Sequence, residues 1–151
     1  MKTLANDLDQ QEILNRIAEL SKSENAKWGR MSVHEMICHL NDSYCVPLGE
    51  KRVSPDTGVL QRTVFKWIAL WAPIQWMKGY PTRPEIEQGR GGTPPNEFEA
   101  DRAALRLVFM RFCKALPQTS FSHPVFGPMG AHEWGRWGYL HADHHLRQFG
   151  H

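Results

Sequence analysis

The chain has 151 residues, of which 41% are hydrophobic, and this content is sufficient for the core of one domain spanning 1–151. Eighteen basic and sixteen acidic residues leave a formal net charge of +2, and no block of basic residues is present. This balance argues against a nucleic-acid partner. The three cysteines are widely spaced and form no Cys-x-x-Cys pair, which argues against a disulfide framework and a zinc knuckle.

The sequence also argues against a membrane partner. Its N-terminal segment meets charge before any apolar run could form a signal peptide. The most apolar stretch, 67–77, is shorter than the ~20 residues that a membrane span needs. Because the cysteines fit reduced thiols, we expect a cytoplasmic protein.

Apolar residues recur at the three-to-four spacing of an amphipathic helix in the first third of the chain. They predict a first helix over 7–20. A second helix begins at the capping box Ser32-Val-His-Glu35, in which the hydroxyl and the carboxylate can each satisfy a free backbone N–H. Pro47 is expected to end this second helix.

The middle of the chain predicts a helix followed by a long loop. The helix is rich in tryptophan and is expected over 60–78, with a kink at Pro73. Between 79 and 96 the sequence holds too many prolines and glycines for regular structure. The length of this loop is compatible with a lid or with simple disorder.

Two further helices complete the predicted secondary structure. Asn96 is expected to cap a long helix, with Glu99 at the capping-box position, and the last helix is expected over 131–149. No segment shows sustained period-two alternation. The predicted fold class is therefore all-α, a helical bundle.

The last helix gives the best indication of function, because two of its histidines share one face. At about 100° per residue, His141 and His145 lie on one stripe with Trp134 and Trp137. Burying an unpaired polar nitrogen costs about 1–3 kcal/mol, so inward imidazoles need hydrogen-bond partners or a metal ion. The spacing His-x-x-x-His on a helix is a recurrent way to offer two nitrogens to one metal. A satisfied pair of core histidines is the alternative.

A catalytic metal commonly takes three protein ligands, and His39 is the candidate for the third. It lies at the margin of the apolar stripe of the second helix, where a side chain can reach a groove between helices. Glu35 and Asp42 flank His39 at i−4 and i+3. One of them could orient the ring or act as a general base, although a solvated charge is the default for such residues.

The other polar and aromatic residues of the last helix are expected to surround the metal. His144 is offset from the stripe and is expected beside the site or at the surface, and Gln148, one turn further on, could pair with it. Trp134 and Trp137 are expected to wall a pocket that the 79–96 loop edges. Such a pocket implies a small-molecule substrate that is partly apolar.

Three segments carry a resemblance to a known family. They are Trp28-Gly-Arg-Met-Ser32 before the helix with His39, His123-Pro-Val-Phe-Gly127, and the terminal His141-x-x-His144-His145-x-x-Gln148. These segments resemble the DinB/YfiT-like superfamily of metalloenzymes, and the middle one resembles a single branch of it. The resemblance is strong over about 28–44 and 123–149.

The resemblance implies a four-helix bundle and a divalent metal bound by one histidine of the second helix and a His-x-x-x-His pair of the last. In this chain those positions are His39, His141 and His145. The four bundle helices would be the ones that begin near residues 7, 32, 96 and 131. The Trp-rich helix would then be an addition that covers the site or forms an interface.

The ligand set and the resemblance leave the chemistry open between two reactions. Zinc, nickel and iron(II) all accept imidazole nitrogen, so the sequence does not choose among them. Hydrolysis by a metal-activated water is one reaction, and thiol-dependent transfer or isomerisation is the other. Related proteins with thiol-dependent activity often have Arg-Gly after the double histidine. Leu146-Arg147 follows here, which argues against a bacillithiol or mycothiol co-substrate.

A different class of protein would also account for these histidines. In this alternative the chain is a non-enzymatic helical dimer that keeps a structural or vestigial metal site. We expect a homodimer under the enzyme interpretation as well.

Overall fold

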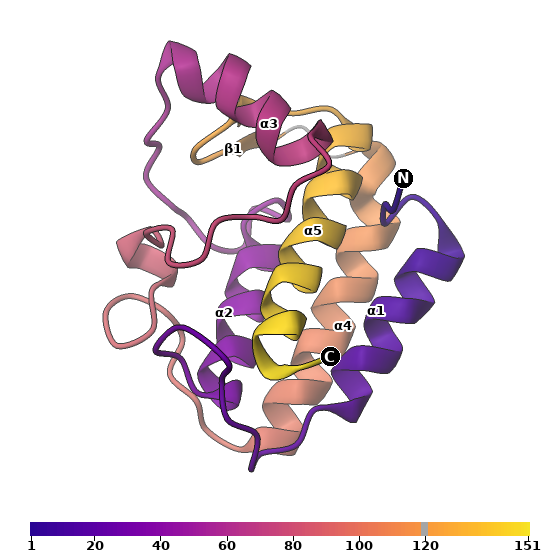
Figure 1. Cartoon of the computed structure of the whole chain (residues 1–151), viewed down its shortest axis with the longest axis vertical. Helices are drawn as coiled ribbons and strands as arrows, with labels where there is room; N and C mark the ends of the chain where they lie inside the picture. The colour runs from indigo at the N-terminus through magenta and orange to yellow at the C-terminus, as the bar shows by residue number, and fades with distance from the viewer. Residues whose placement is uncertain (119–120) are drawn as a thin grey trace.

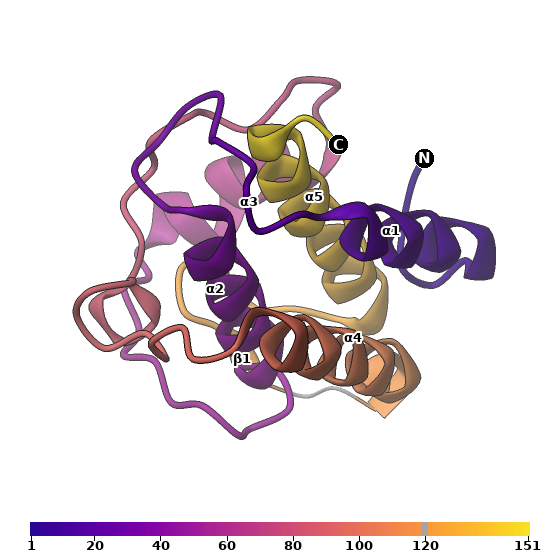
Figure 2. The same ribbon diagram turned by 90° about the horizontal axis from the view of Figure 1, so that it is seen from below.

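Four long helices form the body of the protein in the computed structural model, which describes residues 1–118 and 121–151. They are α1 (Asp7–Glu19), α2 (Val33–Cys45), α4 (Phe98–Ala115) and α5 (Ala131–Phe149). The four helices lie side by side (Figure 1) and, seen along the bundle, surround a common interior (Figure 2). The predicted all-α class is confirmed. Within the described ranges no helix has the length and apolar character that would let it cross a membrane.

The core forms where the apolar stripes of the helices meet. Ile13 and Ile17 of α1 are fully buried, as is Tyr44 of α2. The hydroxyl of Tyr44 donates a hydrogen bond to the carbonyl of Gly138 in α5, at 2.8 Å. A Cβ at Gly138 would lie 2.6 Å from the ring of Phe112, so this glycine lets α5 approach α4 closely.

The Trp-rich segment forms less helix than predicted. A π-helical turn, η1 (Gln61–Phe65), leads into α3 (Lys66–Trp71), and α3 lies across one end of the bundle (Figure 1). Ala72 follows with an extended ψ of 142°, because the residue before a proline is disfavoured in the α region. Pro73 therefore ends the helix instead of kinking it, and residues 72–80 continue without helical structure.

The 79–96 loop contains one short 3-10 turn, η2 (Pro84–Ile86), and leads into α4. The expected cap at Asn96 is corrected to Glu97, whose carboxylate accepts a backbone N–H of the first turn. Asn96 lies one residue before the cap and donates its backbone N–H to the Asp101 carboxylate, at 2.9 Å. Both contacts satisfy N–H groups at the start of the helix.

A short irregular connection joins α4 to α5. It includes the 3-10 turn η3 (Leu116–Gln118) and an antiparallel pair of two-residue strands, β1 (Ser122–His123) and β2 (Gly127–Pro128). Strands of this length cannot show period-two alternation in the sequence. The last helix, α5, has the bounds that its periodicity predicted.

Candidate metal centre

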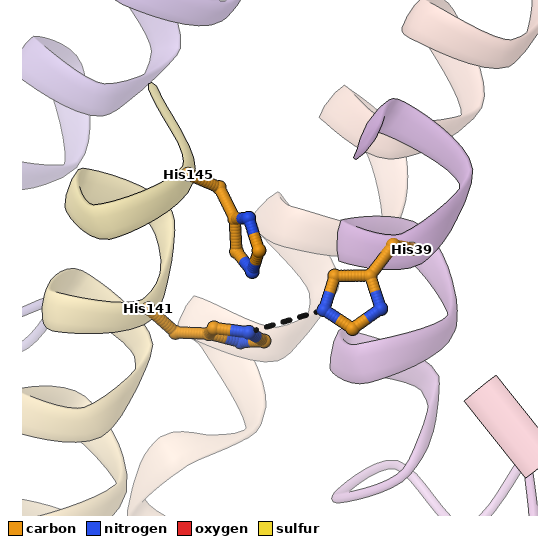
Figure 3. Close-up of side chains that lie close together, drawn as sticks. All are labelled: His39, His141 and His145. Atoms are coloured by element: carbon orange, nitrogen blue, oxygen red, sulfur yellow. Dashed lines mark hydrogen bonds between the residues drawn. The ribbon is translucent and has the colours of Figure 1, made fainter. Parts of the chain in front are cut away.

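Three histidines from two helices meet inside the bundle. His39 comes from α2, and His141 and His145 come from neighbouring turns of α5 (Figure 3). One ring nitrogen of each residue lies within 4.8 Å of the others, and the ring centroids are 4.8–5.3 Å apart. This three-histidine group could hold a metal ion.

A carbonyl outside the group fixes the ring of His39. The Nδ1 atom of His39 lies 3.1 Å from the carbonyl oxygen of Ile86 in η2. A carbonyl oxygen can only accept a hydrogen bond, so Nδ1 carries the proton and Nε2 presents a lone pair. That lone pair faces Nε2 of His141, 3.3 Å away. His141 must therefore donate a proton to His39 or share a cation with it.

Gln148 fixes the ring of His145 in the same manner. The amide nitrogen of Gln148 donates to the carbonyl of Trp28 at 2.7 Å, which leaves its amide oxygen 3.1 Å from Nδ1 of His145. Because this oxygen only accepts, Nδ1 of His145 is protonated and Nε2 is free. The expected pairing of Gln148 with His144 is corrected to a pairing with His145, because the bond to Trp28 directs the amide oxygen toward His145.

His141 is held differently from the other two rings. Its Nδ1 atom is buried and has no hydrogen-bond partner within the described part of the chain. Aromatic packing holds the ring instead: the centroid of Trp137 lies 4.9 Å away and that of Trp76 lies 5.9 Å away. The outer side of the imidazole is thus positioned by ring contacts, and its Nε2 atom faces His39.

Burial keeps the three imidazoles in the form that binds metal. Desolvation is the main cause that lowers the pKa of His39. Desolvation also lowers the pKa of His141 and His145 well below the ordinary histidine value, and repulsion from neighbouring histidines is the second cause. A neutral imidazole offers a lone pair, whereas a protonated one does not. Lone pairs are therefore available at neutral pH.

The predicted aromatic and polar neighbours lie at different depths around the group. Trp137 contacts His141 directly. The ring of His144 has its centroid 5.2 Å from that of His145. Trp134 is fully buried one layer further out, where its ring packs against Trp137 and its indole N–H donates to a carbonyl before β1.

The two carboxylates predicted near His39 make other contacts. Glu35 completes the capping box of α2 by accepting the backbone N–H of Ser32, at 2.7 Å. Asp42 is buried and accepts both the backbone N–H and the hydroxyl of Thr93, each at 2.7 Å. Asp42 therefore ties the 79–96 loop to α2, which positions the loop that supplies the carbonyl on His39.

Two features of the site were absent from the predicted set. One is the backbone carbonyl of Ile86, for which no side-chain pattern exists. The other is Gly29, where φ is +85° and a Cβ would lie 2.4 Å from the amide nitrogen of Gln148. Only glycine leaves room for this amide against the Trp28 carbonyl. The Trp28-Gly pair in the resembling segment was the signal that could have found it.

A cleft opens beside the group, near the C-terminal end of α5. It has a volume of ≈ 310 Å³, and its lining includes Trp28, Trp76, His144 and the basic residues Lys27 and Lys78. The ring of Trp76 also packs against both His141 and His144. Trp76, from the segment after α3, therefore contacts both the cleft and the three-histidine group, whereas Trp134, Trp137 and the 79–96 loop, which were predicted to line the pocket, do not line this cleft.

Comparison with known proteins gives a family and no activity. The family model described as "Protein of unknown function (DUF1569)" matches residues 3–151. No curated protein and no solved structure matches the chain. The function must therefore be argued from the geometry of the site.

Proposed function

The chain belongs to the DUF1569 family, and from its site we propose that it is a metal-dependent enzyme of the DinB/YfiT-like type. His39, His141 and His145 are the ligands of a divalent ion, and a small substrate reacts beside it. The orientation of two rings carries this proposal. Oxygen acceptors outside the group hold the Nδ1 protons of His39 and His145, which leaves their Nε2 lone pairs for one ion.

The number of ligands supports an enzyme over a structural site. In the part of the chain that the structure describes, no fourth histidine, cysteine or carboxylate joins the three-histidine group. Structural zinc sites usually have four protein ligands, whereas catalytic sites have three and leave a position for water or substrate. This favours the enzyme over the alternative of a non-enzymatic dimer with a structural ion.

Three neutral imidazoles leave a divalent ion its full positive charge, which supplies Lewis acidity to a substrate oxygen or lowers the pKa of a bound water. The chain's own residues position the ligands and shield them. Ile86 and Gln148 hold two rings in the required tautomer. Trp76 and Trp137 cover His141. We place hydrolysis first and thiol-dependent transfer second, because Leu146-Arg147 stands where the thiol-dependent relatives have Arg-Gly.

The cleft supports a small substrate with an apolar part and a negative charge. Trp28 and Trp76 offer flat apolar surfaces. Lys78 lies over the ring of Trp28, with its Nζ 4.4 Å from the centroid. Neither Lys27 nor Lys78 forms an ion pair with a described residue. Both charges are therefore available to an anionic group.

Cobalt substitution tests this proposal. The d–d spectrum of the cobalt-loaded protein should report a site with nitrogen ligands, and added azide should change it by entering a free position. His141→Ala should abolish the azide-sensitive d–d spectrum of the three-histidine group and hydrolysis of small ester substrates together. His132→Ala, at an exposed position of the same helix, should leave both unchanged. A nitrogen-ligand spectrum that azide does not alter would favour the structural site, and absence of that spectrum would contradict the proposal.

A further inference from the structure

A second group of side chains that could hold a metal ion lies between the start of α2 and α4. Its members are His34 and Cys38 of α2 and Asp101 of α4, whose ligand atoms all lie within 4.8 Å of one another. The Nε2 atom of His34 lies 2.7 Å from Oδ2 of Asp101, and the sulfur of Cys38 lies 3.8 Å from the same oxygen. We propose that these three residues form a second cation site, which takes a thiophilic divalent ion such as zinc.

The helices bring the three ligands together on a face separate from the three-histidine group. His34 and Cys38 are four residues apart, so they lie one turn apart on the same face of α2. Asp101 stands in the first turn of α4, and the backbone N–H of Asn96 holds its carboxylate at 2.9 Å. The ring of Phe98 packs edge-on against His34, with centroids 5.3 Å apart. Each ligand is thus positioned by the bundle itself.

The chemistry of the donor set fits zinc. Thiolate, imidazole and carboxylate are the three ligand types that proteins use for this ion. Cys38 and Asp101 together supply two negative charges, which neutralise a divalent cation in a partly buried place. On binding, the thiol proton of Cys38 passes to solvent, the proton on Nε2 of His34 is exchanged through solvent for one on Nδ1, and the sulfur–metal and nitrogen–metal bonds form, so no electrons are exchanged.

Access and distances also fit. Cys38 is 3% exposed, but the side chains of His34 and Asp101 are 13% and 25% exposed, which leaves a route for the ion and a place for water as fourth ligand. Tetrahedral zinc, with bonds of about 2.0–2.3 Å, separates its ligand atoms by roughly 3.3–3.5 Å. The nitrogen–oxygen pair must therefore open by about 0.6 Å from its hydrogen-bonded distance, which torsions of the His34 and Asp101 side chains provide.

The test is a cobalt titration of the full-length, reduced protein. A thiolate ligand gives a charge-transfer band in the near ultraviolet, and the three-histidine group contains no sulfur that could produce it. We expect this band in the unmodified protein. Cys38→Ser should remove it, whereas the double variant Cys45→Ser, Cys113→Ser should retain it. His141→Ala should also retain the band, because this site does not depend on the other one.

Further variants keep the test decisive if Cys38→Ser does not fold. Asp101→Asn and His34→Gln alter partly exposed ligands, and each should weaken cobalt binding at least tenfold, read from the same band, while far-ultraviolet circular dichroism stays unchanged. If the unmodified protein shows nitrogen-type d–d bands without the charge-transfer band, the three residues are a hydrogen-bonded network and the proposal is wrong. If the band keeps its full strength in both Asp101→Asn and His34→Gln, the cobalt is bound by a single thiol, and the proposal is equally wrong.

Discussion

Replacing Gln148 with methionine tests whether an outer hydrogen bond prepares His145 for a metal. The Gln148 side chain is 3% exposed and bridges the Trp28 carbonyl and Nδ1 of His145, at 2.7 Å and 3.1 Å. Methionine has a similar volume but donates no hydrogen bond and is only a weak acceptor. In Gln148→Met the N–H of His145 and the Trp28 carbonyl each lose a partner, and the imidazole is free to change its tautomer.

The expected size of the effect follows from these contacts. Loss of such an outer partner typically weakens metal binding 10- to 100-fold, which is about 1.4–2.7 kcal/mol. Each buried group left without a partner also costs about 1–3 kcal/mol of folding stability. Gln148→Glu is the matched control, because its carboxylate still accepts from His145 while it loses the donor to Trp28. We expect Gln148→Glu to lose stability and keep its metal affinity.

Competition with a chromophoric zinc chelator at fixed pH measures the affinity, and thermal unfolding of the metal-free proteins measures the stability. An unchanged affinity in Gln148→Met would refute the argument from tautomers. If Gln148→Glu lost as much affinity as Gln148→Met, the site would depend on packing around residue 148 and not on the hydrogen bond.

Three further predictions concern residues around the site. Gly29→Ala should weaken zinc binding at least tenfold in the same competition assay, because its methyl group would lie 2.4 Å from the Gln148 amide. An affinity equal to that of the wild type would show that the backbone around residue 29 moves to make room for the methyl group. Burial lowers the pKa of His123 to about 3, so below pH ~6.5 this imidazole is protonated in the unfolded chain and stays neutral in the folded chain. The difference lowers the free energy of unfolding by about 2 kcal/mol at pH 5, and this loss increases as the pH falls toward 3. The ring of His123 accepts the backbone N–H groups of Val125 and Phe126, each at 3.1 Å. His123→Asn keeps a side-chain acceptor there but should lose less stability between pH 7 and pH 5 in urea titrations; an equal loss would contradict the assignment. Asp42→Ala removes the two hydrogen bonds that Thr93 donates to the carboxylate, and it should speed proteolysis within the 79–96 loop while the helix content stays constant; unchanged cleavage would mean that other contacts hold the loop.

Helix periodicity predicted much of the architecture and one side of the site. His141 and His145 lie on the inward stripe of α5, and His39 lies at the margin of α2, as a regular helix requires. That they bind a metal stays a prediction. The predicted extent of the Trp-rich helix was wrong, because Pro73 disfavours the α region for the residue before it and so ends the helix.

The remaining parts of the site follow from contacts that no local pattern encodes. The carbonyl of Ile86 reaches His39 from a loop without periodicity. The partner of Gln148 is decided by the Trp28 carbonyl, 120 residues away in the sequence. Such choices arise from tertiary packing, so spacing along one helix could suggest that Gln148 orients a histidine but not which one.

The way His141 is held has a consequence for the speed at which an ion exchanges. The rings of His39 and His145 cannot turn without breaking a hydrogen bond on the outer nitrogen. The ring of His141 has no partner for its outer nitrogen in the described part of the chain, and on that side the indoles of Trp137 and Trp76 hold it. A bound ion would therefore leave by first losing His141 as a ligand. Its dissociation rate would depend on how closely the two indole rings pack against this imidazole.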